Sequence, residues 1–511
     1  MKAPDAARSG MGVVLALAAV KLAAHLWNAS HYGIFRDELY FLACSEHLDW
    51  GYVDFPPLVA AIAWFARHAF GESLLALRLL PALAGAAKIV LAGLLARALG
   101  GGRYAQGLAA LAVLVAPIYL GIDHILTMNA FEPLFWMGGA LCVVRWIRTG
   151  DERLWAGFGV LMGLGLLNKQ TTLSFGFAVV AGLLLTPARR AFAKPGIWIG
   201  GAIAALIALP NVLWMARHGF PMLELLANIR RSGRDVALAP GAFLAEQALF
   251  LLPLTASLWI AGLVWLFVAK EGRPYRCLAW TWVVFEATLI LTHGRTYYAA
   301  PIFPLYFAAG GVALEQWLSG KGRAVGLVKP AYAALVAAGG LAFAPMFLPV
   351  LSEEGYIRYA ERLGLGQPKL ENHEIGPLPQ FYADMHGWEE MAKEVARIYG
   401  ALPADERARA AVFGNNYGEA GAIDFYGPKL GLPKAIGGHQ NYFLWGPRGA
   451  TGDVLIVLGE GSRAAIESKC RSVEVAAVLN DRYAMPYENR PIYVCRGIDL
   501  AGLWPQLKNW N

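Results

Sequence analysis

The chain has 511 residues, of which 57% are hydrophobic, 16% are charged and 12% are aromatic. Soluble domains carry roughly 25% charged residues, so this composition excludes an ordinary soluble protein and indicates a polytopic α-helical membrane protein. The formal net charge of +7 does not indicate nucleic-acid binding, because Lys and Arg are spread between apolar runs instead of forming one basic face.

The first apolar run, "MGVVLALAAVKLAAHLW", follows a short basic N-terminus, which is also the arrangement of a secretion signal. No small-residue cleavage site with a polar chain after it is found here, and further apolar runs follow. We therefore expect an uncleaved first helix.

Apolar windows of about 20 residues, the length that crosses ~30 Å of hydrocarbon, predict about 11 membrane helices. They are expected near residues 11–28, 74–97, 105–121, 129–146, 154–168, 171–186, 195–215, 241–268, 275–292, 298–317 and 328–350. With the N-terminus in the cytoplasm, Lys and Arg gather in the inner loops, as the positive-inside rule requires. The loops at 36–58 and 216–240, and everything after residue 351, are then expected on the outer side.

Near residue 351 the long apolar runs give way to mixed sequence with Gly and Pro turns. We therefore predict a transmembrane domain over residues 1–350 and a soluble α/β domain, outside the cytoplasm, over residues 351–511. Alternating strands and helices are typical of a small α/β sheet. Strands are expected at "AAVFGNN", "DVLIVLG" and "PIYVCRG", and helices near 386–399 and from Glu419 and Ser462.

The five cysteines show no metal-ligand spacing, so a zinc–cysteine site is not expected. Cys470 and Cys495 would both face an oxidising compartment, where they either form a disulfide or stay as unlinked buried thiols. Lys21 and Lys88 fall inside predicted helices and have no assigned role. Pairing with internal acids or carbonyl groups would satisfy their charges.

Carboxylates gather directly after the first apolar run, in "RDELYFLACSEHLDWGYVDFPPL". On spacing alone, a solvated loop and a functional site explain them equally well. Asp37 and Glu38 follow the first helix, and Asp54 precedes the two prolines that open an expected interfacial helix. Glu132 lies about one turn into a predicted membrane helix, where an ionisable side chain is costly and indicates function.

Several stretches resemble the lipid-linked-sugar-dependent glycosyltransferases related to protein O-mannosyltransferases and the lipid A aminoarabinose transferase. In the first half they are "RDELYF", "GYVDFPPL", "NAFEPLFW", "GLLNKQTTL" and "PNVLWMARHGF". The tail is similar to the outer domain of bacterial members in "LPQFYADMHGWEEMA", "NNYGEAGAIDFYG", "GGHQNYFLWGP" and "ENRPIYVCRG". The resemblance covers nearly the whole chain. It implies a GT-C fold in a bacterial inner membrane and the transfer of a sugar from a polyprenyl phosphate to an acceptor outside the cytoplasm.

The resemblance also implies roles for the carboxylates. By match to the family motifs, Asp37 is the catalytic base with Glu38 beside it, and Glu132 is the second carboxylate at the membrane edge. Asp54 occupies the acidic position that can hold a divalent metal ion in some relatives. Close relatives often carry Asp in place of Glu132, and some carry Glu-Lys where this chain has Asp54-Phe55, so a lysine contact from this loop is missing.

A departing lipid phosphate is an anion that cations must stabilise. Outer-face candidates are Lys169, Arg217, Arg230, Arg231, Arg234 and Arg295. Lys169 and Arg295 rank first because "LLNKQTT" and "GRTYYAAP" resemble family stretches, although snorkelling at helix ends would also explain them. Binding to anionic headgroups would explain the cluster at 230–234.

The family stretches add Arg36, Tyr40, Pro56 and Tyr298 as candidates for substrate binding. His218 is either a metal ligand beside Asp54 or an ordinary interfacial histidine. The expected partners are a polyprenyl-phosphate-linked sugar, membrane lipids and a cell-envelope acceptor, which is lipid A, another glycan or a protein hydroxyl. The tail is expected to cap the membrane cavity and select the acceptor.

Three other function classes fit less well. A multi-span transporter would explain many helices and some buried charge, but it predicts internal repeats and broken helices at the midplane, and the sequence shows neither. A nucleotide-sugar transferase would need a soluble catalytic domain, commonly with a D-x-D metal motif, and no D-x-D occurs here. A receptor or scaffold would not need so many membrane helices.

Overall fold

The computed structural model describes the whole chain except residues 1–8, 234–237, 320–321, 323–325, 365–372 and 461. Arg234, one of the candidate cations, lies outside the described residues. The chain forms two compact units. We call residues 1–29, 70–213 and 237–350 the helical unit, and residues 30–69, 214–236 and 351–511 the α/β unit. The sequence predicts one boundary near residue 351, whereas the first loop and the 214–236 segment group with the tail.

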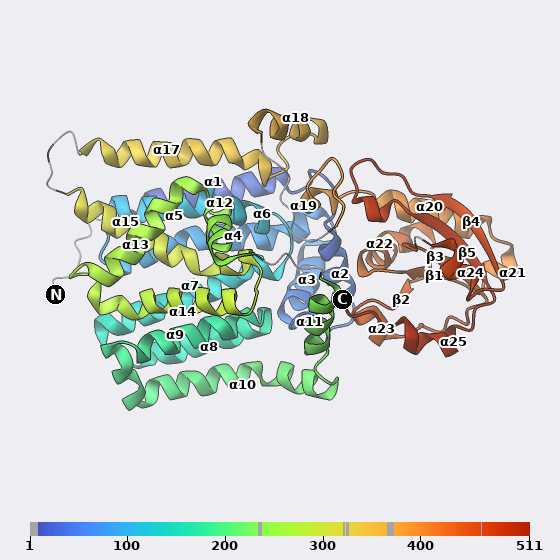
Figure 1. Cartoon of the computed structure of the whole chain (residues 1–511), viewed down its shortest axis with the longest axis horizontal. Coiled ribbons are helices and arrows are strands. Elements are labelled where there is room, and N and C mark those ends of the chain that lie inside the picture. The colour runs from blue at the N-terminus through green and yellow to red at the C-terminus, as the bar shows by residue number, and fades with distance from the viewer. Residues whose placement is uncertain (1–8, 234–237, 320–321, 323–325, 365–372, 461) are drawn as a thin grey trace. The chain divides into compact units, whose positions relative to one another are not determined.

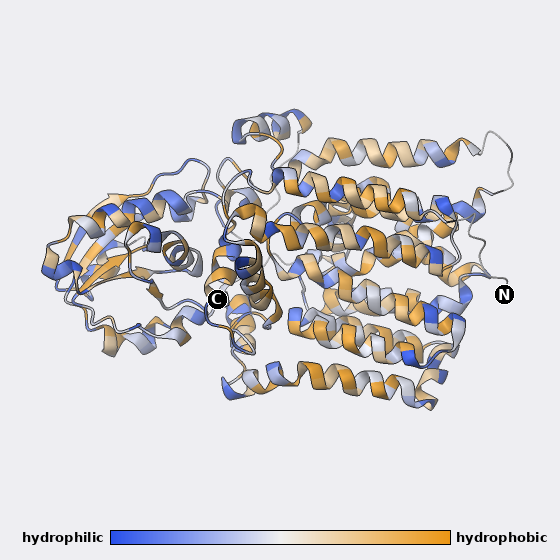
Figure 2. Ribbon diagram, turned by 180° about the vertical axis from the view of Figure 1, so that it is seen from behind, coloured by the Kyte–Doolittle hydropathy of each residue, from blue (hydrophilic) through white to orange (hydrophobic). Residues whose placement is uncertain are grey.

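The helices of the helical unit lie side by side (Figure 1). They are α1 (Met11–Asn28), α4 (Leu74–Ala98), α5 (Arg103–Val115), α6 (Pro117–Ile122), α7 (Met128–Thr149), α8 (Arg153–Asn168), α9 (Thr171–Leu184), α10 (Pro195–Arg217), α12 (Pro240–Phe250), α13 (Ala256–Val268), α14 (Arg276–Leu291), α15 (Phe303–Trp317) and α17 (Val328–Phe343). Their residues are largely hydrophobic (Figure 2), so lipid can solvate the side chains that do not pack in the core.

A helix occupies each of the predicted positions, but the predicted number of spans is not confirmed. Within the described residues, six helices are long and apolar enough to cross a membrane, or up to eight if two bent pairs each count as one span. The others are shorter. The chain is therefore a multi-pass membrane protein.

Two segments predicted as single helices are broken. The 241–268 segment bends by 104° between α12 and α13, where Leu252 has a φ of +72°. Pro253 disfavours the helical region for the residue before it, which ends the helix at this point. The same effect separates α5 from α6, since Ala116 precedes Pro117 and adopts an extended ψ of 121°. The sequence argument against a transporter counted broken helices as absent, so these bends remove that part of the argument.

The lysines inside the membrane helices share one buried acid. Lys21 Nζ lies 2.9 Å from Asp123 Oδ2, and Lys88 Nζ pairs with Asp123 Oδ1. All three side chains are fully buried, and Lys21 also donates to the Tyr119 carbonyl at 2.9 Å. The expectation that these lysines pair with an internal acid is confirmed, and the pairing joins α1 and α4 to the segment after α6.

The α/β unit contains one five-stranded mixed sheet with the order β2-β1-β3-β5-β4. The strands are β1 (Ala410–Gly414), β2 (Ile436–Gly437), β3 (Val454–Val457), β4 (Ser472–Val478) and β5 (Pro491–Arg496). β1 pairs in parallel with β2 and β3, while β5 is antiparallel to β3 and β4. The three predicted strands are confirmed. β2 was missed because it has two residues, and β4 because it is a largely exposed edge strand without clear alternation.

The α/β unit also contains helices (Figure 1). They include α2 (Arg36–Ser45), α3 (Leu58–Phe70), α11 (Pro221–Ser232), α18 (Glu353–Leu363), α20 (Trp388–Ala401), α22 (Tyr417–Tyr426) and α24 (Arg463–Glu467). Helices α20, α22 and α24 confirm the predicted ones. Cys470 and Cys495 are joined by a disulfide with their Cα atoms 5.8 Å apart, so the disulfide is the correct one of the two alternatives.

Candidate functional site

Helix α2 starts at Arg36, so Asp37 lies in its first turn. The backbone N–H of Phe35 donates to Glu38 Oε2 at 2.9 Å, which caps the helix. Helix α22 packs directly against α2. A side chain at Gly421 would meet Leu39, and one at Gly418 would come within 2.6 Å of Arg36 Cγ. These two glycines therefore allow the tail helix to approach the first loop closely.

Asp37 is partly accessible, with 37% of its side chain exposed. Its Oδ1 accepts a hydrogen bond from the Tyr417 hydroxyl at 2.8 Å, and Arg36 Nε lies 3.8 Å from the same oxygen. Its Oδ2 makes no hydrogen bond to any residue that the structure describes. One oxygen is thus fixed while the other can accept a proton.

Tyr40 and Asp54 form a second pair in the same loop. The Tyr40 hydroxyl lies 3.1 Å from Asp54 Oδ1 and 3.2 Å from Asn441 Oδ1, so its single proton can go to either oxygen. The backbone N–H of Asn441 donates to the Tyr40 hydroxyl at 3.1 Å. Burial, with the neighbouring Asp54 charge, raises the pKa of Tyr40 well above its usual range, so the hydroxyl stays protonated. We call Asp37, Tyr40 and Asp54 the acidic cluster.

Arg36 is held by the tail. Its Nη1 donates to the Tyr487 hydroxyl at 2.6 Å and lies 3.8 Å from Asp384 Oδ1. The Asp384 carbonyl also accepts the backbone N–H of Arg36 at 2.9 Å. The guanidinium therefore keeps positive charge beside Asp37, and its predicted contact with substrate stays a prediction.

Two further predicted residues shape the loop. Glu38 is fully buried and caps α2, so its carboxylate faces the protein interior. Pro56 is buried between Asp54 and the start of α3. The catalytic role predicted for Glu38 and the substrate contact predicted for Pro56 stay predictions.

In the helical unit, Glu132 and Lys169 are brought together. Lys169 Nζ lies 3.4 Å from Glu132 Oε2 and donates to Asn129 Oδ1 at 2.7 Å. It also lies 4.2 Å from the centre of the Tyr298 ring, a cation–π distance. The Thr171 hydroxyl donates to Glu132 Oε1. We call these five residues the lysine cluster.

Three residues of the lysine cluster were predicted as site residues from the sequence, namely Glu132, Lys169 and Tyr298. The other two were not predicted. Asn129 and Thr171 lie inside the family stretches "TMNAFEPLFW" and "LNKQTT", which is the signal that could have identified them. Arg295 is half-buried and precedes the short 3-10 helix Thr296–Ile302 that carries Tyr298. Its carbonyl accepts the backbone N–H of Tyr298 at 3.0 Å.

The candidates at the end of α10 are exposed. No hydrogen bond or ion pair of Arg217 is seen among the described residues. His218 stacks on Trp214 with 4.0 Å between ring centres, and its Nδ1 lies 2.9 Å from the Trp214 carbonyl. Trp214 in turn donates its indole N–H to Asp49 Oδ2 at 2.7 Å. The role of His218 as a metal ligand stays a prediction beside that of an ordinary interfacial histidine.

A metal site at Asp54 and His218 gains no support from these contacts. Within the described part of the chain, no group of three or more His, Cys, Asp or Glu side chains could hold a metal ion. The Asp54 carboxylate lies within hydrogen-bond distance of the Tyr40 hydroxyl, and a divalent ion would need several oxygen ligands besides it. We therefore assign no step of the reaction to a metal.

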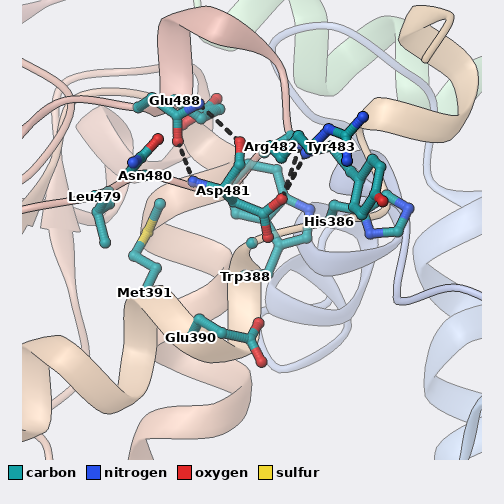
Figure 3. Close-up of a pocket in the computed structure, with 13 residues that line it drawn as sticks. His386, Trp388, Glu390, Met391, Leu479, Asn480, Asp481, Arg482, Tyr483 and Glu488 are labelled. Carbon is teal, nitrogen blue, oxygen red and sulfur yellow. Dashed lines mark hydrogen bonds between the residues drawn. The ribbon is translucent and has the colours of Figure 1, made fainter. Parts of the chain in front are cut away.

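A cavity of about 360 Å³ lies in the α/β unit, between the start of α20 and the segment 479–489 (Figure 3). Asp481 fills one wall, but its Oδ1 already accepts the backbone N–H groups of Tyr483 and Ala484 at 2.7 and 3.1 Å. The backbone N–H of Asp481 donates to Asn489 Oδ1 at 2.7 Å. Because these polar groups hold the loop together, we assign no ligand to this cavity.

Comparisons with known proteins agree with the motifs. Residues 54–214 match the family model described as dolichyl-phosphate-mannose-protein mannosyltransferase. The lipid A galacturonosyltransferase RgtD of Rhizobium johnstonii is 30% identical over 224 residues, which cover 41% of this chain and 44% of that protein. The chain therefore spans less than half the length of this curated relative in the comparison.

Solved structures show the fold. ArnT from Cupriavidus metallidurans bound to undecaprenyl phosphate matches with a TM-score of 0.62 at 16% identity, over 95% of this chain and 98% of that chain. The apo structure of the same protein matches with a TM-score of 0.60 at 16% identity and the same coverage. An oligosaccharyltransferase from Archaeoglobus fulgidus, tethered with an acceptor peptide, gives 0.51 at 14% identity, over 83% and 64% of the two chains. The resemblance predicted from the motifs is confirmed, and the fold is that of ArnT.

Proposed function

We propose that the chain is a glycosyltransferase that takes a sugar from a polyprenyl phosphate and transfers it to a cell-envelope acceptor on the outer face of a bacterial inner membrane. The accessible Asp37 carboxylate carries this proposal, because one oxygen is fixed by Tyr417 and the other is available for a proton. The named activities of the relatives support the reaction class.

In this reaction, Asp37 Oδ2 takes the proton of the acceptor hydroxyl as that oxygen attacks the anomeric carbon of the sugar. A new bond forms between the acceptor oxygen and the anomeric carbon, while the bond from that carbon to the phosphate oxygen breaks. The phosphate leaves with the bonding electron pair and so gains negative charge. General base catalysis of this kind typically contributes roughly 10²-fold to 10⁴-fold to the rate.

Lys169 is the proposed cation for the leaving phosphate. Its ammonium is held by Glu132, Asn129 and Tyr298, so its position is fixed before the lipid binds. Fixed charges stabilise a developing anion without reorganising during the reaction. Arg295, at the head of the short helix that carries Tyr298, is the second candidate for this contact.

Lipid A is the first acceptor to test, because the curated relative is named for that acceptor. The purified protein in bilayer nanodiscs would be incubated with a polyprenyl-phosphate-linked uronic acid and lipid A, and products measured by mass spectrometry. A mass increase of one sugar on lipid A is the expected result. Labelling of a protein Ser or Thr instead would redirect the acceptor assignment, and labelling of neither across a panel of donors would contradict the transferase proposal.

The proposed orientation is tested separately with topology reporters. A reporter fused after residue 351 should be active on the outer side, and one fused near Arg190 on the cytoplasmic side. The reverse pattern would place the acidic cluster in the cytoplasm and overturn the proposed membrane face.

A further inference from the structure

Tyr417 and Asn441 come from the tail, yet both bind the acidic cluster of the first loop. We propose that they are positioning residues for sugar transfer, with Tyr417 holding Asp37 and Asn441 holding the Tyr40–Asp54 pair. The inference rests on the proposed function, in which Asp37 is the base. It gives the tail a part in the chemical step in addition to any role in selecting the acceptor.

The Tyr417 hydroxyl acts as a hydrogen-bond donor. Burial raises the pKa of Tyr417 well above its usual range, so the phenol stays protonated. It donates to Asp37 Oδ1 at 2.8 Å, and an O–H bond to an ionised carboxylate is about twice as strong as one between neutral groups. The bond fixes the rotation of the Asp37 carboxylate and leaves Oδ2 to face the acceptor.

The Tyr417 ring stacks on two other rings. It stacks on Tyr40 with 4.7 Å between ring centres and an interplanar angle of 21°, and on His439 with 4.9 Å and 13°. The backbone N–H of Tyr417 donates to His439 Nδ1 at 3.1 Å. His439 Nδ1 is therefore an acceptor, which leaves its Nε2–H to donate to the Asn511 carbonyl at 3.2 Å.

The start of α22 is also fixed, which holds Tyr417, the first residue of the helix, in position. Asn416 caps the helix by accepting the N–H groups of Gly418 and Glu419 at 2.8 and 3.0 Å. Glu419 Oε2 accepts the N–H of Asn416 at 3.1 Å in return. This reciprocal cap satisfies donors that would otherwise be unpaired at the end of the helix.

Asn441 performs the same task for the second pair. Its Oδ1 accepts the backbone N–H of Val53 at 2.7 Å, and its own N–H donates to the Tyr40 hydroxyl at 3.1 Å. Tyr40 can then donate to Asp54 Oδ1 at 3.1 Å. The preceding Gln440 has a φ of +49°, a strained conformation for a residue other than Gly, which the surrounding contacts must enforce.

The hydroxyls of Tyr417 and Tyr40 thus each lie within hydrogen-bond distance of a carboxylate, and the two rings stack on each other. Tyr417 binds Asp37, while Tyr40 binds Asp54. The residues that set the stack belong to α22 and to the loop after β2, far from the first loop in sequence. Movement of the tail would therefore change the orientation of the acidic cluster.

The test is Tyr417→Phe, which keeps the stacked ring and removes only the hydroxyl. We expect kcat to fall by roughly tenfold to a hundredfold, the effect of losing a charge-assisted hydrogen bond. KM values for donor and acceptor and the melting temperature should stay near those of the wild type, because the bond orients a reacting group and contributes little to binding. An unchanged kcat would overturn the assignment. A lower kcat together with a clearly lower melting temperature would also overturn it, because the loss of activity would then follow from a loss of stability.

Tyr442→Phe is the matched control. Tyr442 is also buried in the α/β unit, and its hydroxyl donates to a buried carboxylate, Asp424 Oδ2, at 3.1 Å. The substitution removes the same kind of bond away from Asp37 and should leave kcat unchanged. A similar fall in kcat for both variants would mean that any lost tyrosine hydroxyl in this unit disturbs transfer, and the positioning role would be rejected.

A double-mutant cycle separates this inference from the proposed function. In an Asp37→Asn background, Tyr417→Phe should have little further effect, because the group that it orients no longer accepts a proton. Additive losses would contradict the positioning role. If Asp37→Asn alone keeps full activity, the proposed base is wrong; if it abolishes turnover while Tyr417→Phe does not, only the positioning role fails.

Asn441→Ala tests the second half of the proposal. It removes the acceptor for the Val53 N–H while keeping the backbone donor to Tyr40. We expect a fall in kcat with the melting temperature reduced by only a few degrees, and Asn441→Asp, which restores the acceptor oxygen, should recover part of the rate. No recovery in a folded Asn441→Asp protein would contradict the role assigned to the side-chain oxygen.

Discussion

At the scale of single residues, Asp37 and Glu38 are neighbouring carboxylates of one motif that differ in exposure and in hydrogen bonding. Asp37 is partly exposed and has one oxygen without a hydrogen bond to the described residues, whereas Glu38 is fully buried and caps α2. A base must reach the proton that it accepts, so geometry favours Asp37. By match to the family motif, Asp37 was predicted as the base with Glu38 beside it, and the surroundings of the two carboxylates agree with that order.

The substitution Asp37→Asn should therefore lower kcat by about 10²-fold or more, because it keeps the shape of the side chain and removes the proton acceptor. Donor affinity should change little. Single-turnover measurements with purified protein give both quantities. Asp49→Asn is the control, since Asp49 lies in the same loop and binds Trp214 instead of facing the acceptor. Transfer at the wild-type rate by Asp37→Asn would direct the search to Glu38, Asp54 and Glu132 in that order.

The substitution Lys169→Ala should weaken donor binding or slow phosphate departure by roughly tenfold to a hundredfold, since a charge-assisted contact is worth about 1.5–3 kcal/mol. It also leaves Glu132 buried without its cationic partner, which adds to the cost. Donor titration and turnover would be compared with Lys194→Ala, whose exposed ammonium lies 3.9 Å from Glu152. Equal, small effects of both variants would move the phosphate site to Arg295 or Arg217.

At the scale of elements, most helices and strands could be predicted from periodicity, and the breaks could not. A helix lies at each predicted membrane position, because long apolar runs have few alternatives in a bilayer. The breaks before Pro117 and Pro253 were hidden inside continuous apolar sequence. Partners such as Tyr417 and Asn441 could not be assigned to the site either. Their contacts depend on α22 packing against α2, which no local pattern records.

The disulfide between Cys470 and Cys495 joins the segment before β4 to β5, and both cysteines border the apolar core of the sheet. Closing a loop over a sequence separation of 25 residues restricts the unfolded chain. Replacing both cysteines by Ala should lower the stability of the α/β unit by about 2–4 kcal/mol. Calorimetry of the purified protein with and without reductant measures this. A wild-type melting temperature that reductant does not change, in a sample shown to be reduced, would contradict the expectation.

At the scale of the whole molecule, the division into two compact units differs from a simple membrane part and tail. The lysine cluster lies entirely in the helical unit, while the acidic cluster and its tail partners lie in the α/β unit. The tail is therefore part of the unit that carries the proposed base. We therefore expect variants in the tail to affect turnover and variants around Lys169 to affect donor binding.

The α/β unit also contains a buried pair of acids whose protonation should set the pH dependence of its stability. Glu419 and Glu488 are nearly fully buried, and Asn416 contacts both of them. Burial raises the pKa of Glu419 to about 7. Burial and the neighbouring Glu419 raise the pKa of Glu488 well above its usual range, while Arg36 opposes this and Asp384 adds to it.

A carboxyl whose pKa is higher in the folded than in the unfolded state binds protons more tightly when folded. Its contribution to stability is complete below its unfolded pKa of about 4.3 and is lost as the pH rises through the folded pKa. We therefore expect the melting temperature of the α/β unit to fall between about pH 5 and pH 8, measured by calorimetry at constant ionic strength. Glu488→Gln keeps the hydrogen bond from Asn416 and removes one titrating group, so it should flatten this dependence. The wild-type melting temperature should therefore fall with pH more steeply than that of Glu488→Gln. A variant with the wild-type slope would show that other groups control the stability of the unit.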